Sequence, residues 1–450
     1  MDVLLARPPR RDPREMSLAV PPLGLAYIAA SLRSAGHQVR LIDAAVERWS
    51  CERFETELRH TRPQVLGLSA MTPVADIAER AVKVARPYVD HIVLGGPHPT
   101  AVGAKVFAEM PGLDAAVVGE GEDVAPALLS WWSSGASGPP PPGVRTPDGQ
   151  YRAATEPDIH SLPVPARDLL PMQRYRYLFA TRPGFATMVT SRGCPFRCSF
   201  CDKSVSGSRW RARTPVDVVD ELEQLVRQHG VGFVNFYDDN FTLHRARVVG
   251  ICEEILRRGL DIEWKCEGRV DGVDLPLLRL MRRAGCRTVA YGVESANADT
   301  LALLRKDVTV EQAPAAFAMT RAAGLRSLAY IILGAPGEDA AAVRHTIQFC
   351  HDIRADYVQF SSLVAMPGTP LFASHGSGEG VSNPVDADLS RATITELPPE
   401  VLTGLMREAW GGFYLRPGPM WRLGRDAVAS GSLLEGARMA GALGRWLVAS

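Results

Sequence analysis

The chain has 450 residues and a hydrophobic fraction of 46%, which is enough for two or three globular domains with substantial cores. Fifty basic and fifty acidic residues cancel, so no general electrostatic reason exists to expect nucleic acid or an anionic membrane as the main partner. The chain has no stretch of about 18 apolar residues, and its N-terminal apolar run is too short for a signal peptide, so we expect a cytoplasmic protein.

The first 135 residues alternate short apolar runs of strand type with helical segments. The helical segment LGLAYIAASLRSAG ends at Gly36, and the strand-like runs are DVLLA, QVRLID, QVLGLSA, HIVLGG and AAVVGE. This alternation predicts an α/β domain over residues 1–135, a Rossmann-like fold built on a doubly wound, largely parallel sheet. Residues 136–184 are rich in Pro and Gly, with a turn expected at Pro147, Asp148 and Gly149, and are predicted to be a linker.

A second alternating pattern covers residues 185–375. Its clearest helix has Thr214 as N-cap, Pro215 at the first helical position and Gly230 as terminator. Six strand-like runs, each separated from the next by a helical segment, are FATMVTS, VGFVNFY, IEWKCEG, RTVAYGV, RSLAYIIL and YVQFSSLVA. They predict a complete or partial (β/α)6 barrel of the TIM type, with its chemistry at the carboxyl ends of the strands. Residues 376–450 are expected to form a small, mainly helical region.

Three of the eight cysteines, Cys194, Cys198 and Cys201, are crowded into the segment SRGCPFRCSFC directly after the first of these strands. In a reducing compartment such a cluster indicates metal binding or catalysis. A structural zinc site needs four protein ligands, and no fourth Cys or His lies nearby, since His160 and His229 are distant in sequence. A cubane iron–sulfur cluster held by three thiolates has one iron left for a substrate or cofactor.

The cysteine spacing, three residues and then two, with an aromatic residue before the last cysteine, resembles the motif of radical S-adenosylmethionine enzymes. In that family the open iron chelates S-adenosylmethionine, and one electron cleaves it to a 5′-deoxyadenosyl radical. The resemblance implies contacts with S-adenosylmethionine from the following residues, at the cysteine loop and the strand ends: Phe200, Asp238, Asp239, Arg269, Glu294, Ser295 and Pro367.

Each of these assignments has a plain structural alternative. Many family members carry Gly-Gly-Glu where this chain has Asp238 and Asp239, so the acidic pair is either the ligand of the methionine amine or a helix-capping turn. Arg269 either pairs with a carboxylate in bidentate fashion or lies at the surface. Glu294 and Ser295 either meet the ribose or the carboxylate of the ligand or cap a helix. The segments LGAPGED and AMPGTPLF, the second of which contains Pro367, are either main-chain contacts to adenosine or tight turns.

Four segments of the first pattern, PPLGLAYIAASL, GLSAMT, GGPHPT and VGEGED, resemble the cobalamin-binding domain that is fused to a large radical S-adenosylmethionine subfamily. A corrinoid suits a doubly wound sheet because it can lie across the carboxyl ends of the strands. The resemblance implies cobalamin contacts from the following residues: Leu23, Ser69, Thr72, Gly95, Gly96, His98, Gly119 and Glu120.

Cobalamin proteins that place a histidine beneath cobalt use the motif Asp-X-His-X-X-Gly. The nearest sequence here, Asp158-Ile-His160-Ser-Leu-Pro163, lacks the glycine and lies in the predicted linker. The resemblance therefore implies cobalamin bound without a protein imidazole, as in the methyltransferase subfamily. His98 is the nearby imidazole to watch, with a satisfied loop histidine as its alternative.

The resemblance implies a cobalamin-dependent methyltransferase that uses a 5′-deoxyadenosyl radical and methylcobalamin to methylate an unactivated carbon. The substrate is expected to be a small molecule, either a natural product or lipid-like, and the electron donor a protein such as flavodoxin or ferredoxin. The alternatives are a radical cyclase or rearrangement enzyme without methyl transfer, and a corrinoid and iron–sulfur sensor. The last segment, LLEGARMAGALGRWLVAS, is amphipathic. We expect a packed tail, with an interfacial helix at a membrane as its alternative.

Overall fold

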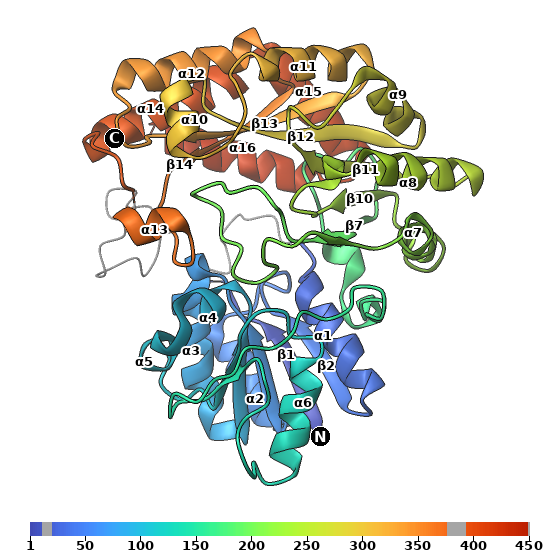
Figure 1. Ribbon diagram of the computed structural model, residues 1–450, viewed down its shortest axis with the longest axis vertical. Coiled ribbons are helices and arrows are strands. Elements are labelled where there is room, and N and C mark those ends of the chain that lie inside the picture. The colour runs from blue at the N-terminus through green and yellow to red at the C-terminus, as the bar shows by residue number, and fades with distance from the viewer. Residues whose placement is uncertain (11–19, 376–392, 449–450) are drawn as a thin grey trace. The chain divides into compact units, whose positions relative to one another are not determined.

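The computed structural model describes residues 1–10, 20–375 and 393–448, which form two compact units (Figure 1). The described parts of Met1–Arg174, Asp202–Gly207 and Met366–Asp386 make up the first unit, and those of Tyr175–Cys201, Ser208–Ala365 and Ala387–Ser450 make up the second. Each unit is built around one parallel sheet, so the predicted α/β class with two successive sheets is confirmed.

The first unit contains a six-stranded sheet in the order β2-β1-β3-β4-β5-β6. Beside β1 the order in which successive strands are added to the sheet reverses. This is the doubly wound arrangement, in which ligands bind at the carboxyl ends of the strands. Five strands are parallel, and the last pairs antiparallel with β5. The strands are β1 (Asp2–Arg7), β2 (Gln38–Asp43), β3 (Val65–Ser69), β4 (His91–Gly95), β5 (Ala115–Val117) and β6 (Val144–Arg145).

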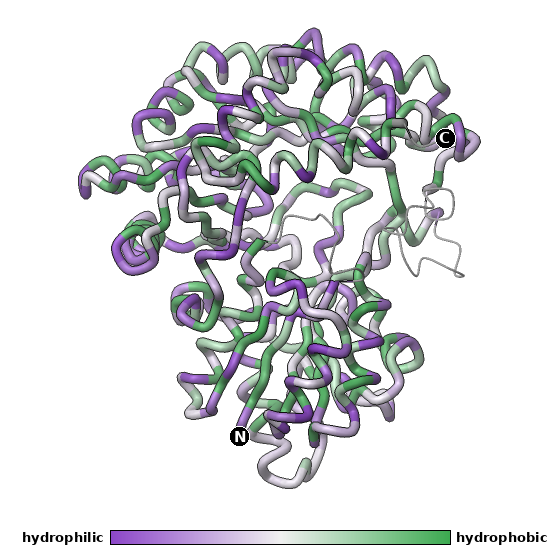
Figure 2. The backbone as a smooth tube through the Cα atoms, turned by 180° about the vertical axis from the view of Figure 1, so that it is seen from behind, coloured by the Kyte–Doolittle hydropathy of each residue, from purple (hydrophilic) through white to green (hydrophobic). Residues whose placement is uncertain are grey.

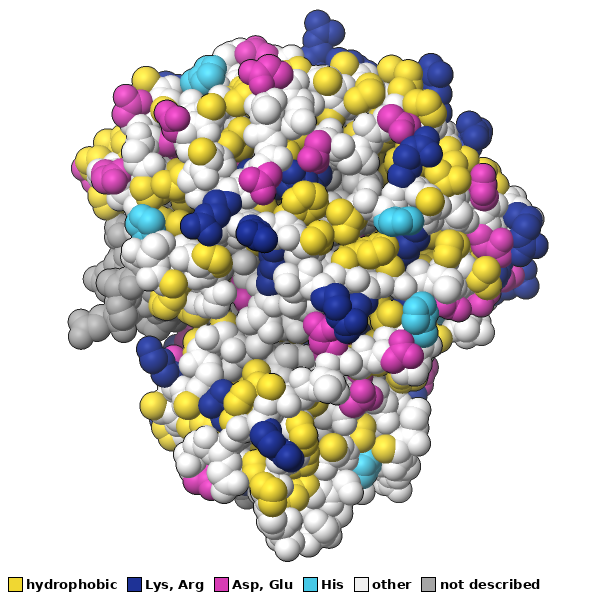
Figure 3. Space-filling model, in the orientation of Figure 1, with side chains coloured by type: hydrophobic (Ala, Val, Ile, Leu, Met, Phe, Trp, Pro, Cys, Tyr) yellow, Lys and Arg dark blue, Asp and Glu magenta, His cyan; other side chains and the backbone are white. Residues whose placement is uncertain are grey.

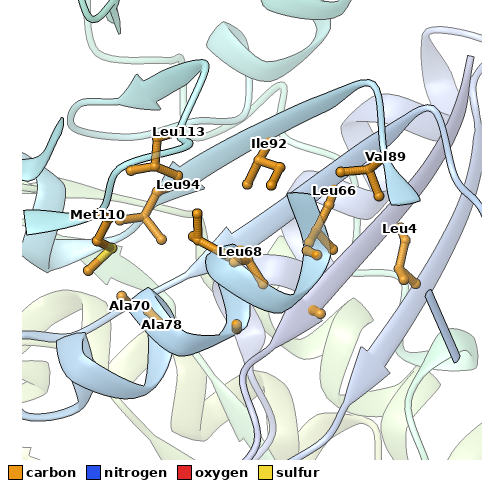
Figure 4. Packing of buried hydrophobic residues seen from close by; sticks show 14 of the residues in the cluster. Leu4, Leu66, Leu68, Ala70, Ala78, Val89, Ile92, Leu94, Met110 and Leu113 are labelled. Carbon is orange, nitrogen blue, oxygen red and sulfur yellow. The ribbon is translucent and has the colours of Figure 1, made fainter. Parts of the chain in front are cut away.

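Helices cover both faces of the first sheet, because its strands are apolar on both sides. Leu4, Leu66, Leu68, Ile92 and Leu94 are at most 2% exposed and point toward one face, where they pack with Ala78 and Met110 (Figure 4). On the other face α1 packs against β1, β2 and α6. The helices are α1 (Leu23–Ser34), α2 (Cys51–Thr61), α3 (Ala75–Ala85), α4 (Pro97–Val102), α5 (Val106–Glu109), α6 (Val124–Ser133) and, in the segment after residue 365, α13 (Pro370–His375).

The second unit contains a six-stranded sheet in the order β14-β13-β12-β11-β10-β7, so successive strands are neighbours and all are parallel. Within the described residues β7 and β14 remain edges, which makes this a partial barrel. The strands are β7 (Phe185–Met188), β10 (Phe233–Phe236), β11 (Glu263–Gly268), β12 (Cys286–Glu294), β13 (Arg326–Leu333) and β14 (Tyr357–Ser362). A separate antiparallel pair is formed by β8 (Ser191–Arg192) and β9 (Arg211–Ala212).

Helices follow the strands of this partial barrel as predicted. The helix that starts after Thr214 has a capping box in which Thr214 and Asp217 satisfy each other's backbone N–H groups, and Gly230 ends it in the left-handed conformation. Figure 2 shows hydrophobic and hydrophilic residues alternating along the outer helices, as expected for helices with one buried face. They are α7 (Pro215–His229), α8 (Arg245–Arg257), α9 (Leu275–Arg283), α10 (Ala298–Leu303), α11 (Gln312–Ala322) and α12 (Ala340–Asp352).

The described C-terminal region consists of α14 (Pro399–Tyr414), α15 (Pro417–Ala429) and α16 (Leu433–Val448). The hydroxyl of Tyr414 donates to the carbonyl of Val358 at 2.6 Å and accepts from its N–H at 3.1 Å, which joins α14 to β14. Buried Asp426 of α15 accepts from Arg326 and from the hydroxyl of Tyr357. Among the described residues no helix is long and apolar enough to cross a membrane.

The segment 136–184 differs from a simple linker. Val144 and Arg145 form β6, and the expected turn at Pro147, Asp148 and Gly149 brings Tyr151 back to bridge Arg145. The physical reason is the free edge of β5, whose backbone groups pair with these two residues. On the face shown in Figure 3, basic and acidic side chains are interspersed, in keeping with the balanced charge of the chain.

Candidate functional site

The cysteine loop connects the short strands β8 and β9, whose pairing of Ser191 with Ala212 holds its two ends together. All three cysteines, Cys194, Cys198 and Cys201, are half-buried, and none of them forms a disulfide. Between them, the N–H of Ser199 donates to the carbonyl of Leu304 at 2.9 Å and its hydroxyl donates to the carbonyl of Leu303 at 3.0 Å. The middle of the loop is therefore fixed to the end of α10.

Asp238, at the end of β10, holds the chain that leads into the cysteine loop. Its carboxylate is 1% exposed and accepts three hydrogen bonds of 2.6 Å, from the N–H and the hydroxyl of Thr190 and from the hydroxyl of Ser191. Buried Arg247 lies 3.9 Å away and also donates to Thr190. Asp239 is exposed, and it accepts from the N–H of Gly193 at 3.1 Å. In this structure the acidic pair positions the loop.

Two cations lie against the aromatic residues of the cysteine loop. The guanidinium of Arg269 lies 3.7 Å from the ring centre of Phe196, and the ammonium of Lys306 lies 5.8 Å from that of Phe200. Arg269 is only 6% exposed, so it is not the surface arginine of the alternative reading. It makes a bidentate pair with Asp271 at 2.9 and 3.0 Å, and it donates to two backbone carbonyls of the loop that contains Lys306.

Lys306 is itself held by Glu294 at the end of β12. Their side chains form a buried ion pair of 2.7 Å. Glu294 has a left-handed backbone with φ 65°, as do Arg305 and Asp307 on either side of Lys306, and such strain persists only where the surroundings enforce it. Gly292 is required beside this pair, because a Cβ atom there would lie 2.4 Å from both Glu294 Oε1 and Lys306 Nζ.

Ser295 belongs to a buried polar network that joins the ends of β12 and β13. Its hydroxyl donates to Glu338 at 3.2 Å and accepts from the N–H of Asn297 at 3.1 Å. Glu338 also accepts from Asn297, from Thr300 and, through its second oxygen, from the N–H groups of Gly334 and Ala335. This carboxylate therefore shapes the loop LGAPGED from within.

An iron–sulfur cluster fits the donor set of the cysteine loop. Burial raises the pKa of Cys198, and the charges of Lys306 and Arg269 oppose that rise. Cations near a cysteine favour its thiolate form, and thiolates are the ligands that such clusters require. Among the described residues no three His, Cys, Asp or Glu side chains converge as they would around a metal ion, and this includes the three cysteines of the loop. The fit therefore rests on the number, spacing and chemistry of the thiols and on the cations beside the loop.

The residues predicted to contact cobalamin lie at the carboxyl ends of β3, β4 and β5 and at the start of α1. Ser69 and Gly95 are neighbours in the β3–β4 pairing. Gly96 has φ 98° and leaves no room for a side chain, since a Cβ atom would lie 2.8 Å from the carbonyl of Ala70 and 2.9 Å from Ser69 Oγ. The N–H of Gly119 donates to Thr100 Oγ1 at 3.1 Å, and Glu120 follows it in the same turn. Leu23 is the first residue of α1 and is half-buried.

His98 lies in the first turn of α4, where its ring has two polar partners. It is 4% exposed, with Nδ1 3.3 Å from Thr72 Oγ1 and Nε2 2.8 Å from Glu109 Oε2. Both ring nitrogens are thus occupied by polar partners of the same unit.

The second unit brings together Cys194, Cys198, Cys201, Phe200, Asp238, Asp239, Arg269, Glu294 and Ser295 around the ends of its strands. Pro367 lies instead in the segment that belongs to the first unit, where a Cβ atom on the adjacent Gly368 would approach Asp202. Sequence reasoning missed Lys306, Asp271 and Glu338. Only Glu338 had a signal, because it stands in the loop LGAPGED that had been singled out for its glycines.

Two protein-family models match the chain, one in each of its two α/β regions. Residues 15–129 match the family described as the B12 binding domain, and residues 188–350 match the Radical SAM superfamily. The two matches fall on the two sheets in the predicted order.

Known proteins are similar to the chain along most of its length. It is 32% identical over 438 residues to "Uncharacterized methyltransferase PH0819" of Pyrococcus horikoshii, covering 93% of both chains. It is 33% identical over 373 residues to the anaerobic magnesium-protoporphyrin IX monomethyl ester cyclase of Rubrivivax gelatinosus, covering 79% of this chain and 66% of the cyclase. It is 28% identical to the hopanoid C-3 methylase of Methylococcus capsulatus, covering 93% and 81%.

Among solved structures, the fold resembles the cobalamin-dependent S-adenosylmethionine radical enzyme OxsB, with a TM-score of 0.74 at 16% identity, covering 98% of this chain and 72% of OxsB. It also resembles the radical S-adenosylmethionine methyltransferase TsrM from Kitasatospora setae, with a TM-score of 0.69 at 21% identity, covering 83% and 74%. At these identities the likeness concerns the fold.

Proposed function

Because this chain belongs to the radical S-adenosylmethionine enzymes that carry an N-terminal cobalamin-binding domain, we propose that it methylates an unactivated carbon of a small molecule. The cofactors of the family are cobalamin, a [4Fe-4S] cluster and S-adenosylmethionine. An electron donor such as flavodoxin or ferredoxin completes the proposal.

One observation favours methyl transfer over other radical reactions. The similarity to the relative named as a methyltransferase extends over 93% of both chains at 32% identity, and a hopanoid methylase is similar over 93% of this chain. The occupied ring nitrogens of His98 also support it, because cobalt without a protein imidazole is more easily reduced to the state that accepts a methyl group.

The residues of this chain contribute binding, position and charge. The three thiols of Cys194, Cys198 and Cys201 hold the cluster, and Asp238 fixes the strand that leads to them. Lys306 and Arg269 lie beside the loop and balance its negative charge. At the edge of the first sheet, the turns at Gly96 and Gly119 carry no side chain that would keep a corrinoid away from the backbone.

When bound, the cofactors supply reductive cleavage of S-adenosylmethionine and transfer of its methyl group. The test is anaerobic reconstitution with iron, sulfide and hydroxocobalamin, followed by mass analysis of the products with methyl-deuterated S-adenosylmethionine and candidate substrates. Methyl transfer to carbon yields S-adenosylhomocysteine, 5′-deoxyadenosine and a deuterated product. A sensor yields neither adenosyl product.

A radical cyclisation without methyl transfer is the second candidate. It is favoured by the 33% identity to the magnesium-protoporphyrin ester cyclase, although this chain spans 66% of that protein. A cyclase forms 5′-deoxyadenosine without S-adenosylhomocysteine. Detection of 5′-deoxyadenosine alone, with a substrate that is consumed, would replace the methyltransferase proposal by this one.

A further inference from the structure

A row of polar side chains crosses the face of the partial barrel opposite α7 to α12, the face on which Arg326 reaches Asp426 of α15. Asn235 of β10 is in register with Lys265 of β11, which is in register with Thr288 of β12. Register partners in a parallel sheet point to the same face. The opposite face carries Trp264 and Tyr291, which bond to Ala284 beyond the end of α9 and to Thr320 on α11. The polar row therefore lines the inner face of the partial barrel.

The row has a buried charge pair at its centre. Lys265 is 0% exposed and its ammonium donates to Glu267, which lies two residues further along β11 on the same face. The ammonium of Lys265 also donates to Asn235 Oδ1 at 3.4 Å. Burial works against the charge of Lys265, but the Glu267 carboxylate outweighs it and raises the pKa of the lysine. The hydroxyl of Tyr330 donates to the same carboxylate oxygen at 3.2 Å. The buried ammonium thus has a carboxylate partner within the row.

Three polar atoms of this cluster have no hydrogen-bond partner, and one of them is Thr288 Oγ1. Asn235 is 1% exposed, and its Nδ2 donates no hydrogen bond, while Glu267 Oε2 accepts none. Burial raises the pKa of Tyr237, and the nearby Asn235 amide opposes that rise. The Nδ2 atom of Asn235 nevertheless has no partner in hydrogen-bond geometry. Buried donors and acceptors without partners are expensive in free energy. They contrast with Asp238 and Glu338 in the same unit, both of whose carboxylate oxygens are bonded.

The cluster lies between an aromatic floor and the cysteine-loop end of the sheet. On its amino side, the ring of Tyr177 stacks on Phe185 at 4.9 Å and on Phe233 at 6.1 Å, and these phenylalanines precede the polar row by two positions. On its carboxyl side, Asn235 precedes Asp238 by three residues and Glu267 precedes Arg269 by two. A group held here would lie next to the strand ends that carry the proposed chemistry.

We propose that Asn235 and Glu267 form a substrate subsite that takes a neutral hydrogen-bonding group, an amide or a hydroxyl. Such a group accepts from Asn235 Nδ2 and donates to Glu267 Oε2. A charged group is disfavoured because Lys265 and Glu267 already neutralise each other, so a further ion would be buried without a partner. This inference rests on the proposed function only in treating the inner face of the partial barrel as the place of the substrate.

The direct test is a soak of anaerobic crystals of the reconstituted holoenzyme with butyramide, 1-butanol or butyrate. The expected result is butyramide or 1-butanol within hydrogen-bond distance of Asn235 Nδ2 and Glu267 Oε2, which also tells an amide from a hydroxyl subsite. Butyrate should stay out. Ordered waters that bond both atoms and persist in every soak, or butyrate bound in their place, would overturn the proposal.

Variants separate recognition from a structural role. Asn235→Leu keeps the Lys265–Glu267 pair and removes the unpartnered amide nitrogen, together with the 3.4 Å contact between Lys265 and Asn235 Oδ1, so the variant should lose a little stability and butyramide should no longer bind. A folded variant that still binds butyramide at this place would contradict the proposal. Glu267→Gln is the second variant. Tyr291→Phe changes a side chain on the opposite face of the sheet, so it is the matched control and should keep butyramide binding.

Kinetics supply the last measurement once a substrate is known. Asn235→Leu should raise KM by about 10- to 100-fold with a smaller change in kcat, the effect of losing one hydrogen bond to a neutral group in a buried site. The soak needs no turnover, so failure of methyl transfer and failure of the subsite remain distinguishable. An unchanged KM together with a water-filled subsite would contradict the inference while leaving the methyltransferase proposal intact.

Discussion

The two sheets present their carboxyl ends in different ways. The first ends in turns that depend on backbone conformation, such as Gly95–Gly96 and Gly119, and its one buried histidine is held by Thr72 and Glu109. The second ends in buried charges, of which Asp238 and Glu294 are held by partners on other strands or loops. One edge is built from glycine turns, while the other carries buried charges that position the cysteine loop. We therefore expect substitutions at the two edges to impair the protein for different physical reasons.

The largest effect is expected from the thiols of the second sheet. Cys198→Ala should abolish cluster formation, because a cubane needs all three protein thiolates to stay attached. Iron and sulfide content after reconstitution measures this, and 5′-deoxyadenosine should not form. Cys51→Ser, a half-buried cysteine at the start of α2 in the first unit, is the control and should retain the cluster. An intact cluster in the Cys198 variant would refute the ligand assignment.

The next effect separates the two acidic neighbours at the end of β10. Asp238→Ala leaves three buried donors without their acceptor and Arg247 without its ion-pair partner, so the free energy of unfolding should fall by about 3–5 kcal/mol in urea titrations. Asp239→Ala removes an exposed carboxylate that accepts from Gly193, and should cost about 1 kcal/mol or less. Equal losses would mean that burial does not distinguish the two carboxylates.

The backbone of the first sheet is tested at two glycines. Gly96→Ala should destabilise the fold by about 3 kcal/mol, because φ 98° is strained for alanine and the new Cβ would lie 2.8 Å from the carbonyl of Ala70. Gly119→Ala should cost about 1 kcal/mol, since φ 82° is strained but no atom lies within 4 Å. Urea unfolding gives both values, and equilibrium titration with hydroxocobalamin should show the greater loss of affinity for Gly96→Ala.

The smallest effect concerns His98. Electron paramagnetic resonance of the bound cobalt(II) corrinoid should show no hyperfine splitting from an axial nitrogen, and His98→Ala should leave the spectrum unchanged, because both ring nitrogens already have partners. The variant should lose about 1 kcal/mol of stability from the broken hydrogen bonds. Nitrogen splitting that disappears in the variant would show that this imidazole is an axial ligand after all.

Much of the fold was predictable because its signals are local. The apolar runs marked the strands of both sheets, and Thr214, Pro215 and Gly230 marked the limits of one helix. The cysteine spacing and the four segments of the first domain predicted the family. The strand β6 was missed, since two residues in a stretch rich in Pro and Gly have no periodicity and pair only because the edge of β5 is free.

The sequence by itself determined the main helices and strands, the order in which they follow and the spacing of the three cysteines, because helix caps, strand alternation and short motifs act over a few residues. Only the tertiary structure decided the roles of the charged residues. Asp238 bonds across 48 positions of sequence to Thr190, and Ser295 across 43 positions to Glu338. Asn235 and Glu267, on neighbouring strands, each keep one polar atom without a partner. Long-range packing sets the solvation and the partner of each such group, and these two quantities fix what a polar side chain can do.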